Sequence, residues 1–237
     1  MANKYLIRTI GPTVPSMYTD KRLLGNYDYG LSLFKPSTDS CMKWLDKKED
    51  RSVVYVSFGS YADLVDKQMR EVAWGLIDSK FSFLWVVRGT EESKLPRDFT
   101  SELHDDNGLT VNWCSQLAVL AHRAIGCFLT HGGWNSTLEA LSLGVPMVVM
   151  PQWTDQTTNA KLVADVWKIG VRVTADENGI VMREEIAAAV NEVMQGDGGL
   201  VIRRNAMKWK DLAVEAVDEG GSSDSNVTEF AMELLRT

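Results

Sequence analysis

The sequence predicts an α/β protein with a doubly wound parallel sheet, and three observations support this prediction. Short apolar runs alternate with amphipathic stretches through most of the 237 residues. Glycine, polar or aromatic residues follow the ends of several of these apolar runs. Only helical patterns remain near the end of the chain. Strands that alternate with helices favour right-handed crossovers, which place parallel strands side by side.

The order of elements follows from the position of each pattern along the chain. Residues 1–36 contain three prolines and several glycines, which predict an irregular arm or linker. Apolar runs predict six strands, at 52–60, 81–87, 108–113, 125–130, 146–150 and 170–174. Periodic apolar positions predict helices between them, at 66–79, 115–122, 136–143 and 155–167, and then at 183–194, 200–219 and 226–236. We therefore expect one domain over 37–219, with 220–237 forming a separate terminal helix.

The composition narrows the classes of function. An apolar fraction of 45% and a charged fraction of 24% are typical of soluble globular proteins. A net charge of -7 disfavours nucleic acid as a partner, because nucleic acid needs basic surface. We expect no membrane span, no secretion signal and a cytoplasmic location, because neither an apolar span nor an apolar signal core is present. Cys41, Cys114 and Cys127 lack the spacing of a metal site, so we expect free thiols.

The stretch "HGGWNSTLEALSLGVP", residues 131–146, places a histidine and two glycines before a predicted helix. Glycines let the backbone approach a ligand closely. A helix N-terminus carries unpaired N–H groups and partial positive charge, which suit an anion such as phosphate. The same stretch also contains "STLE", a capping box in which Ser136 would cap the helix and Glu139 would reach back. The local pattern leaves both interpretations open.

Several chemically distinctive residues follow the ends of predicted strands. Ser60 follows the first strand, Trp113 ends the third, the loop from His131 follows the fourth, and the segment 153–156 follows the fifth. The carboxyl ends of parallel strands share one edge of the sheet, where open α/β sheets bind ligands. We therefore predict a binding site at this edge.

The run from Trp113 to Gln156, "WCSQLAVLAHRAIGCFLTHGGWNSTLEALSLGVPMVVMPQWTDQ", resembles the 44-residue signature of plant UDP-dependent glycosyltransferases of secondary metabolism. "VVYVSFGS" and "TIGPTVPS" are similar to the same family, nearest to its salicylate- and terpenoid-glucosylating branch. The resemblance implies a GT-B fold of two Rossmann-like domains. This chain is similar to the second half of such enzymes, which holds the nucleotide sugar, whereas the first half holds the acceptor and the catalytic base.

The resemblance also implies a role for each site residue. Trp113 would stack on uracil, the backbone of Cys114 and the side chain of Gln116 would read the uracil edge, and Glu139 would accept both ribose hydroxyls. The diphosphate would be held by His131, Asn135, Ser136 and Ser60. The sugar would contact Trp134, Asp155 and Gln156, and glutamine at position 156 accompanies glucose in the family.

Structural alternatives stay open for several of these residues. Trp113 could be a core tryptophan and His131 a structural histidine. Asp155 and Gln156 could serve as a polar pair that caps the next helix. No cofactor or metal is implied.

The catalytic base of the family, a histidine near the start of its first domain, has no counterpart in this sequence. The histidines are His104, His122 and His131, and none lies in a comparable position. We therefore expect no catalytic residue in this chain, which would bind UDP-glucose and release UDP together with a missing N-terminal acceptor domain.

Two alternatives differ in class from this donor-binding half. The first is a free-standing UDP-sugar-binding module that acts with a separate catalytic chain. The second, an unrelated dehydrogenase, is disfavoured because "SFGSYADL" is not the G-x-G-x-x-G fingerprint.

Overall fold

The computed structural model describes residues 7–23, 25–30, 37–103 and 107–236. Its six strands form one sheet in the order β3-β2-β1-β4-β5-β6, with every neighbouring pair parallel. The order runs outward from β1 in both directions, so the switch point lies between β1 and β4. The predicted doubly wound parallel sheet is confirmed. The strands are β1 (Val53–Ser57), β2 (Ser82–Val86), β3 (Gly108–Val111), β4 (Ile125–Thr130), β5 (Met147–Val149) and β6 (Gly170–Arg172).

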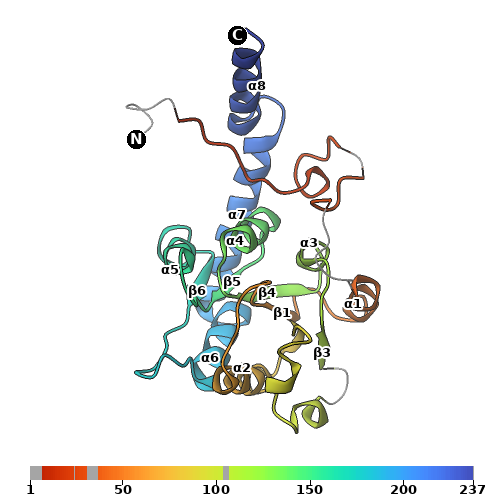
Figure 1. Cartoon of the computed structure of the whole chain (residues 1–237), viewed down its shortest axis with the longest axis vertical. Coiled ribbons are helices and arrows are strands. Elements are labelled where there is room, and N and C mark those ends of the chain that lie inside the picture. The colour runs from red at the N-terminus through yellow and green to blue at the C-terminus, as the bar shows by residue number, and fades with distance from the viewer. Residues whose placement is uncertain (1–6, 24, 31–36, 104–106, 237) are drawn as a thin grey trace.

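Helices cover both faces of the sheet (Figure 1). Helices α2 and α6 pack against each other and cover one face, and α1, α3, α4 and α5 lie over the other. Helix α7 contributes to both cores. The helices are α1 (Thr38–Leu45), α2 (Asp66–Ser79), α3 (Gln116–Leu120), α4 (Trp134–Leu143), α5 (Gln156–Lys161), α6 (Arg183–Met194), α7 (Asp197–Val217) and α8 (Ser222–Leu234).

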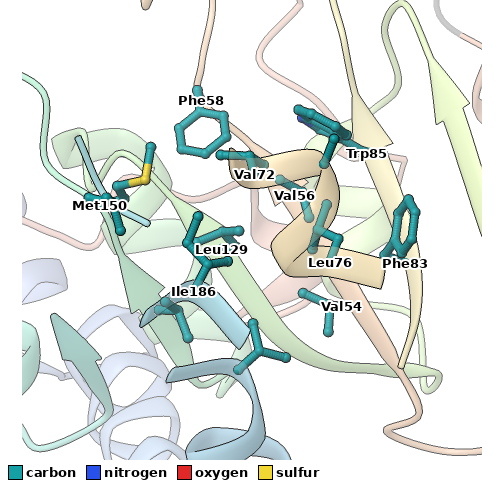
Figure 2. Close-up of a cluster of buried hydrophobic side chains, with 14 of the residues drawn as sticks. Val54, Val56, Phe58, Val72, Leu76, Phe83, Trp85, Leu129, Met150 and Ile186 are labelled. Carbon is teal, nitrogen blue, oxygen red and sulfur yellow. The ribbon is translucent and has the colours of Figure 1, made fainter. Parts of the chain in front are cut away.

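Strand β1 shows why the apolar runs are continuous instead of alternating. All five of its residues are buried, because successive side chains enter different cores. Val54 and Val56 pack toward α2 and α6, in the cluster drawn in Figure 2 with Leu76, Leu129 and Ile186. Val53 and Tyr55 point to the opposite core. A strand covered on both faces has no solvent side, so its sequence contains no polar alternation.

The first turn of α4 differs from the sequence prediction. The helix begins at Trp134, two residues before the expected start, with Gly133 in the N-cap position. No side chain caps it, so the capping box of Ser136 and Glu139 is wrong. Both side chains instead bond to Gln116, through Ser136 Oγ and Glu139 Oε2. Tertiary hydrogen bonds therefore replace the local ones that the motif predicts.

The segment expected as one helix over 155–167 changes type part-way. The α-helix ends at Lys161 and a π-helical turn follows over Leu162–Val166. Its hydrogen bond from Trp167 N to Leu162 O spans five residues. Val163 is fully buried in this turn, whereas Val166 is 59% exposed. The wider turn thus brings one valine into the core.

The last two helices begin earlier than predicted. Helix α7 includes the glycines at 198 and 199, because the Glu192 carboxylate accepts a hydrogen bond from Gly198 N at 3.1 Å. Helix α8 starts at Ser222 after Gly221. The arm explains this start: Ser223 Oγ accepts from Gly11 N at 2.9 Å and donates to Gly11 O at 2.6 Å. Among the helices formed by described residues, none is both long and apolar enough to cross a membrane.

Candidate functional site

Two adjoining cavities lie at the carboxyl edge of the sheet. The larger has a volume of about 490 Å³ and the smaller about 350 Å³. They share the loop after β1, at Gly59 and Ser60, and the first turn of α4, at Asn135 and Ser136. Every predicted site residue lines one or both of them. The larger holds Trp113, Cys114, Gln116 and Glu139, the smaller holds His131, Trp134, Asp155 and Gln156, and Ser60, Asn135 and Ser136 line both.

The loop after β3 forms one wall of the larger cavity. Trp113 is half-buried and belongs to neither buried core, so the core alternative for this residue is not supported. Its backbone carbonyl accepts from Ser37 N at 2.8 Å, and Ser115 N donates to Thr38 Oγ1 at 3.0 Å. Ser115 also caps α3 by accepting from Ala118 N. These bonds fix the loop against α1 and hold the indole at the cavity.

Cys114 is buried beneath this loop beside another thiol. Its side chain bonds to Cys41, and its Sγ lies 3.7 Å from Tyr55 Oη. The hydrogen bond to Cys41 and burial together raise the pKa of the Cys114 thiol far above its usual range. Cys41, Cys114 and Cys127 are all free. The thiol of Cys114 is therefore protonated and unreactive, which leaves its backbone as the part that can contact a ligand.

Glu139 is the buried carboxylate of the larger cavity, with an exposure of 5%. Its Oε2 accepts from Gln116 Nε2 at 2.6 Å, and its Oε1 accepts from Tyr29 Oη at 2.8 Å. Burial raises the pKa of Glu139, while these two hydrogen bonds oppose the rise. A carboxylate offers about four acceptor positions, so each oxygen can accept a further hydrogen bond.

His131 lies between the loops that follow β1 and β4. A Cβ on Gly59 would come within 2.8 Å of its Cε1, and one on Gly133 within 2.5 Å of its Nε2. The imidazole therefore fills space that only glycines leave open. Burial lowers the pKa of His131, although Asp155 opposes this effect. The ring is neutral at neutral pH, and its single N–H is engaged by the Ser57 backbone, so the other ring nitrogen becomes a donor only when the imidazole is protonated.

The loop after β5 contributes the remaining polar side chains. Gln156 is buried, and its Oε1 accepts from Gln152 N at 2.8 Å and Trp153 N at 3.1 Å. Among the described residues its Nε2 has no partner, so this amide can reach a ligand. Asp155 occupies the N-cap position of α5 but makes no capping bond. Hydrogen bonds from Thr154 and Asn159 lower the pKa of the Asp155 carboxyl.

The charge of the site is unusual for an anion pocket. No lysine or arginine is among the described residues that line the two cavities. Likewise, no group of three or more potential metal ligands occurs in the described parts of the chain. Positive potential at the junction comes from the N-terminal N–H groups of α4 and from the Arg88 guanidinium behind the cavity wall, 2.6 Å from Ser60 O.

Arg88, Asn159 and Tyr29 also shape the site, although none of them was predicted from the sequence. Arg88 follows β2 and donates to Ser60 O at 2.6 Å and to Ala62 O, which holds the loop after β1. Asn159 is buried and donates to Gly132 O at 2.9 Å and Asp155 Oδ2 at 2.8 Å. Arg88 could have been found by the same strand-end rule as Ser60. Tyr29 could not, because no local pattern points from the arm to Glu139.

The other histidines lie away from the cavities or outside the described residues. His122 precedes β4, at the opposite edge of the sheet, and its Nε2 lies 3.2 Å from Asp46 Oδ1. His104 lies outside the described residues. The cavities therefore contain a single histidine, His131, among the residues that line them.

The chain is similar in sequence to curated plant glycosyltransferases and synthases. The chain is 60% identical over 224 residues to UDP-glycosyltransferase 74E2 of Arabidopsis thaliana, covering 94% of this chain and 49% of that protein. It is 56% identical over 234 residues to mogroside I-E synthase of Siraitia grosvenorii, covering 97% and 51%. The chain thus spans about half the length of the curated relatives it matches.

Solved structures match the same half. Os79 from O. sativa in complex with UDP superposes with a TM-score of 0.94 at 47% identity, covering 98% of this chain and 51% of that one. Phytolacca americana UGT2 complexed with UDP-2fluoro-glucose and pterostilbene gives a TM-score of 0.83 at 37% identity, covering 95% and 48%. The sheet and helices described above therefore correspond to one Rossmann-like domain of the GT-B fold, the C-terminal one.

The family model described as UDP-glucoronosyl and UDP-glucosyl transferase matches residues 16–236. With the site geometry and the relatives, this match assigns the chain: it belongs to the UDP-glucoronosyl and UDP-glucosyl transferase family.

Proposed function

We propose that the chain binds UDP and UDP-glucose in the two adjoining cavities, as the donor-binding half of an inverting glycosyltransferase that glucosylates small plant metabolites. The observation that carries the proposal is that all eleven predicted donor-site residues line these cavities. Their volumes lie within the range of small-molecule sites. The match to Os79, a protein solved with UDP, supports the same assignment.

The larger cavity suits the uridine. Trp113 lines it from the loop after β3, where its ring can stack on a base, a contact that is worth about 1–3 kcal/mol. Gln116 and the backbone of Cys114 line the same cavity and would read the uracil edge. Glu139 would accept hydrogen bonds from the ribose hydroxyls on the lone pairs that Gln116 and Tyr29 leave available.

The junction of the cavities suits the diphosphate. Ser60, Asn135 and Ser136 line both cavities, and the last two lie in the first turn of α4. The N–H groups of this turn would donate to phosphate oxygens, and His131 would join them once its ring is protonated. A bound diphosphate would raise the pKa of His131 and so favour a protonated ring, which would offset the charge of UDP for as long as it is bound.

The smaller cavity suits the sugar. Trp134 and Trp153 are 46% and 54% exposed there, and Asp155 offers an ionised carboxylate. Gln156 can place its Nε2 toward a hydroxyl, because its Oε1 is already held by two backbone N–H groups.

The proposed division of the chain follows from the same assignment. The domain over 37–219 binds the donor, the arm over 1–36 is the linker, and the terminal segment 220–237 packs on a missing acceptor domain. Helix α8 exposes Val227 and Phe230 by 50% and 60%, and its C-cap residue Leu235 is 87% exposed, which fits a face that another domain covers. A separate catalytic chain could supply that domain equally well, as in the module alternative.

Glu139→Ala is expected to weaken UDP binding by about 1–3 kcal/mol. The variant leaves the ribose hydroxyls without an acceptor, and it also leaves the donors of Gln116 and Tyr29 unpaired. Calorimetric titration with UDP, without added metal, measures this change. Glu71→Ala is the matched control: Glu71 is also a buried carboxylate, accepts from Arg183 N at 2.8 Å, and lies on α2, on the far face of the sheet. Equal UDP affinity in Glu139→Ala and the unmodified chain would remove Glu139 from the site.

The same calorimetric titration with NAD should give no binding heat, and tight NAD binding would favour a dehydrogenase instead.

UDP-glucose is expected to protect the chain against thermal unfolding more than UDP-galactose at the same concentration. The two sugars differ in the direction of one hydroxyl, and the fixed Gln156 amide can satisfy only one direction well. One hydrogen bond of this kind contributes about 0.5–1.5 kcal/mol, so the difference should be modest. UDP alone serves as the reference ligand, because UDP-glucose and UDP-galactose both contain it. Identical protection by the two UDP-sugars would contradict the glucose preference.

A further inference from the structure

The arm reaches the floor of the larger cavity through one tyrosine. Tyr29 Oη donates to Glu139 Oε1 at 2.8 Å, across 110 residues of sequence, and Tyr29 lines the cavity together with Asp28. The arm is held in place by its own contacts with the last two helices. Besides the bonds between Ser223 and Gly11, Arg22 pairs with Asp224 at 3.0 Å and donates to Val217 O at 2.6 Å. The tyrosine is therefore presented from an anchored segment.

Tyr29 contributes a wall of the cavity without filling it. The volume of about 490 Å³ is present while the phenol contacts Glu139. Tyr29 uses one carboxylate oxygen and Gln116 uses the other, which fixes the plane of the carboxylate from two sides. Each oxygen keeps acceptor capacity for a ribose hydroxyl. Tyr29 therefore supports Glu139. A side chain that competed with the ligand of Glu139 would instead occupy the open space of the cavity.

We propose that Tyr29 is a positioning residue of the nucleotide site, whose phenol orients the Glu139 carboxylate toward the ribose hydroxyls and gives the arm a direct part in donor binding. The proposal rests on the assignment of the cavity to UDP made above. It adds to that assignment a residue from the arm, which lies outside the strand-end loops.

The electrostatics agree with this role. Burial raises the pKa of Tyr29, so the phenol stays protonated and always donates. Its hydrogen bond helps to hold down the pKa of Glu139 against burial. Lys210 of α7 lies beside Gly144, the C-cap residue at the far end of α4. The other titratable groups that face this carboxylate or its cavity are Tyr18 and Asp28 from the arm, Tyr55 from β1, and Cys114 from the loop before α3.

The test is Tyr29→Phe, which removes only the hydroxyl. UDP affinity is measured by calorimetry from about pH 5 to about pH 8. An ionised Glu139 can accept from both ribose hydroxyls, whereas a protonated carboxyl loses acceptor capacity, so affinity falls as the pH drops through the pKa of Glu139. Loss of the phenol removes one influence that lowers this pKa. The acid limb of the binding profile should therefore move to higher pH, and affinity at neutral pH should fall about three- to tenfold.

Tyr27→Phe is the control, since it makes the same change on the same arm at a ring that packs edge-to-face on Tyr18. It should leave both affinity and profile unchanged. Tighter UDP binding by Tyr29→Phe would show that the phenol competes with the nucleotide, and unchanged or uniformly weaker binding at every pH would assign it a purely structural role. Either result overturns the proposal. Failure of the unmodified chain to bind UDP would instead reject the assignment of the cavity itself.

Discussion

The 237-residue chain alone is expected to transfer no glucose from UDP-glucose, and to gain transfer activity when an acceptor-binding half is supplied separately. Inverting transfer needs a base that removes the proton of the acceptor hydroxyl. The cavities contain His131, which the proposed function assigns to the diphosphate, and no other histidine among the described residues that line them. His122 lies at the opposite edge of the sheet.

The expected effect is large because positioning two substrates together lowers the barrier by about 7–11 kcal/mol in favourable cases. The experiment mixes the chain with the separately produced amino-terminal half of a full-length relative and follows glucoside formation on a panel of small hydroxylated acceptors by mass spectrometry. Circular dichroism of the added half verifies that it is folded. Glucoside formation by the chain alone, above a protein-free control, would refute the donor-half assignment.

Gly132→Ala is expected to lower the free energy of unfolding by about 2–5 kcal/mol. Gly132 has φ of +77°, and a Cβ there would lie 2.5 Å from Val149 Cγ1 in β5. The left-handed conformation costs an L-residue about 1–2 kcal/mol, and the overpacking adds about 1–3 kcal/mol. The loop also carries His131 and leads into α4, and Asn159 bonds to Gly132 O, so UDP binding should weaken as well.

Urea denaturation measures this change, with Gly179→Ala as the matched control. Gly179 has nearly the same φ, +76°, but a Cβ there would meet no atom within 4 Å. It should therefore show the backbone cost alone, about 1–2 kcal/mol. The difference between the two variants isolates the contact with β5. If Gly132→Ala were no more destabilising than Gly179→Ala, the close packing of this loop on β5 would be wrong.

Element order and type could be predicted because buried parallel strands leave a simple signal. Strands such as Ile125–Thr130 are buried throughout and apolar up to their last residue, and the sheet edge they share follows from parallel order alone. That reasoning also brought Ser60, Trp113, the loop from His131 and the segment 153–156 to one edge, whereas Cys114, Gln116 and Glu139 were added by the resemblance to the family signature. Helix boundaries were less predictable, because Gln116 takes the hydrogen bonds that would have made Ser136 and Glu139 a cap.

Contacts between distant segments left no trace in local patterns. The link from Tyr29 to Glu139 joins an irregular arm to a helix, and neither neighbourhood shows it. The π-helical turn at Leu162–Val166 depends on which valine reaches the core, and helical periodicity does not specify that. The functional roles of the site residues stay predictions that the UDP titrations address.

The walls of the two cavities, as far as the described residues form them, contain no lysine or arginine. Attraction by helix N–H dipoles fades over a much shorter range than attraction by a full charge, and the chain as a whole carries a net charge of -7. A nucleotide would therefore reach the two cavities by undirected diffusion, and electrostatic steering would not increase its association rate. Because the first turn of α4 is exposed at Trp134 and Asn135 and helix-dipole attraction is screened by salt, binding of a diphosphate there would weaken as ionic strength rises. Long polyanions need rows of cationic side chains for binding, so we expect them not to bind at the two cavities.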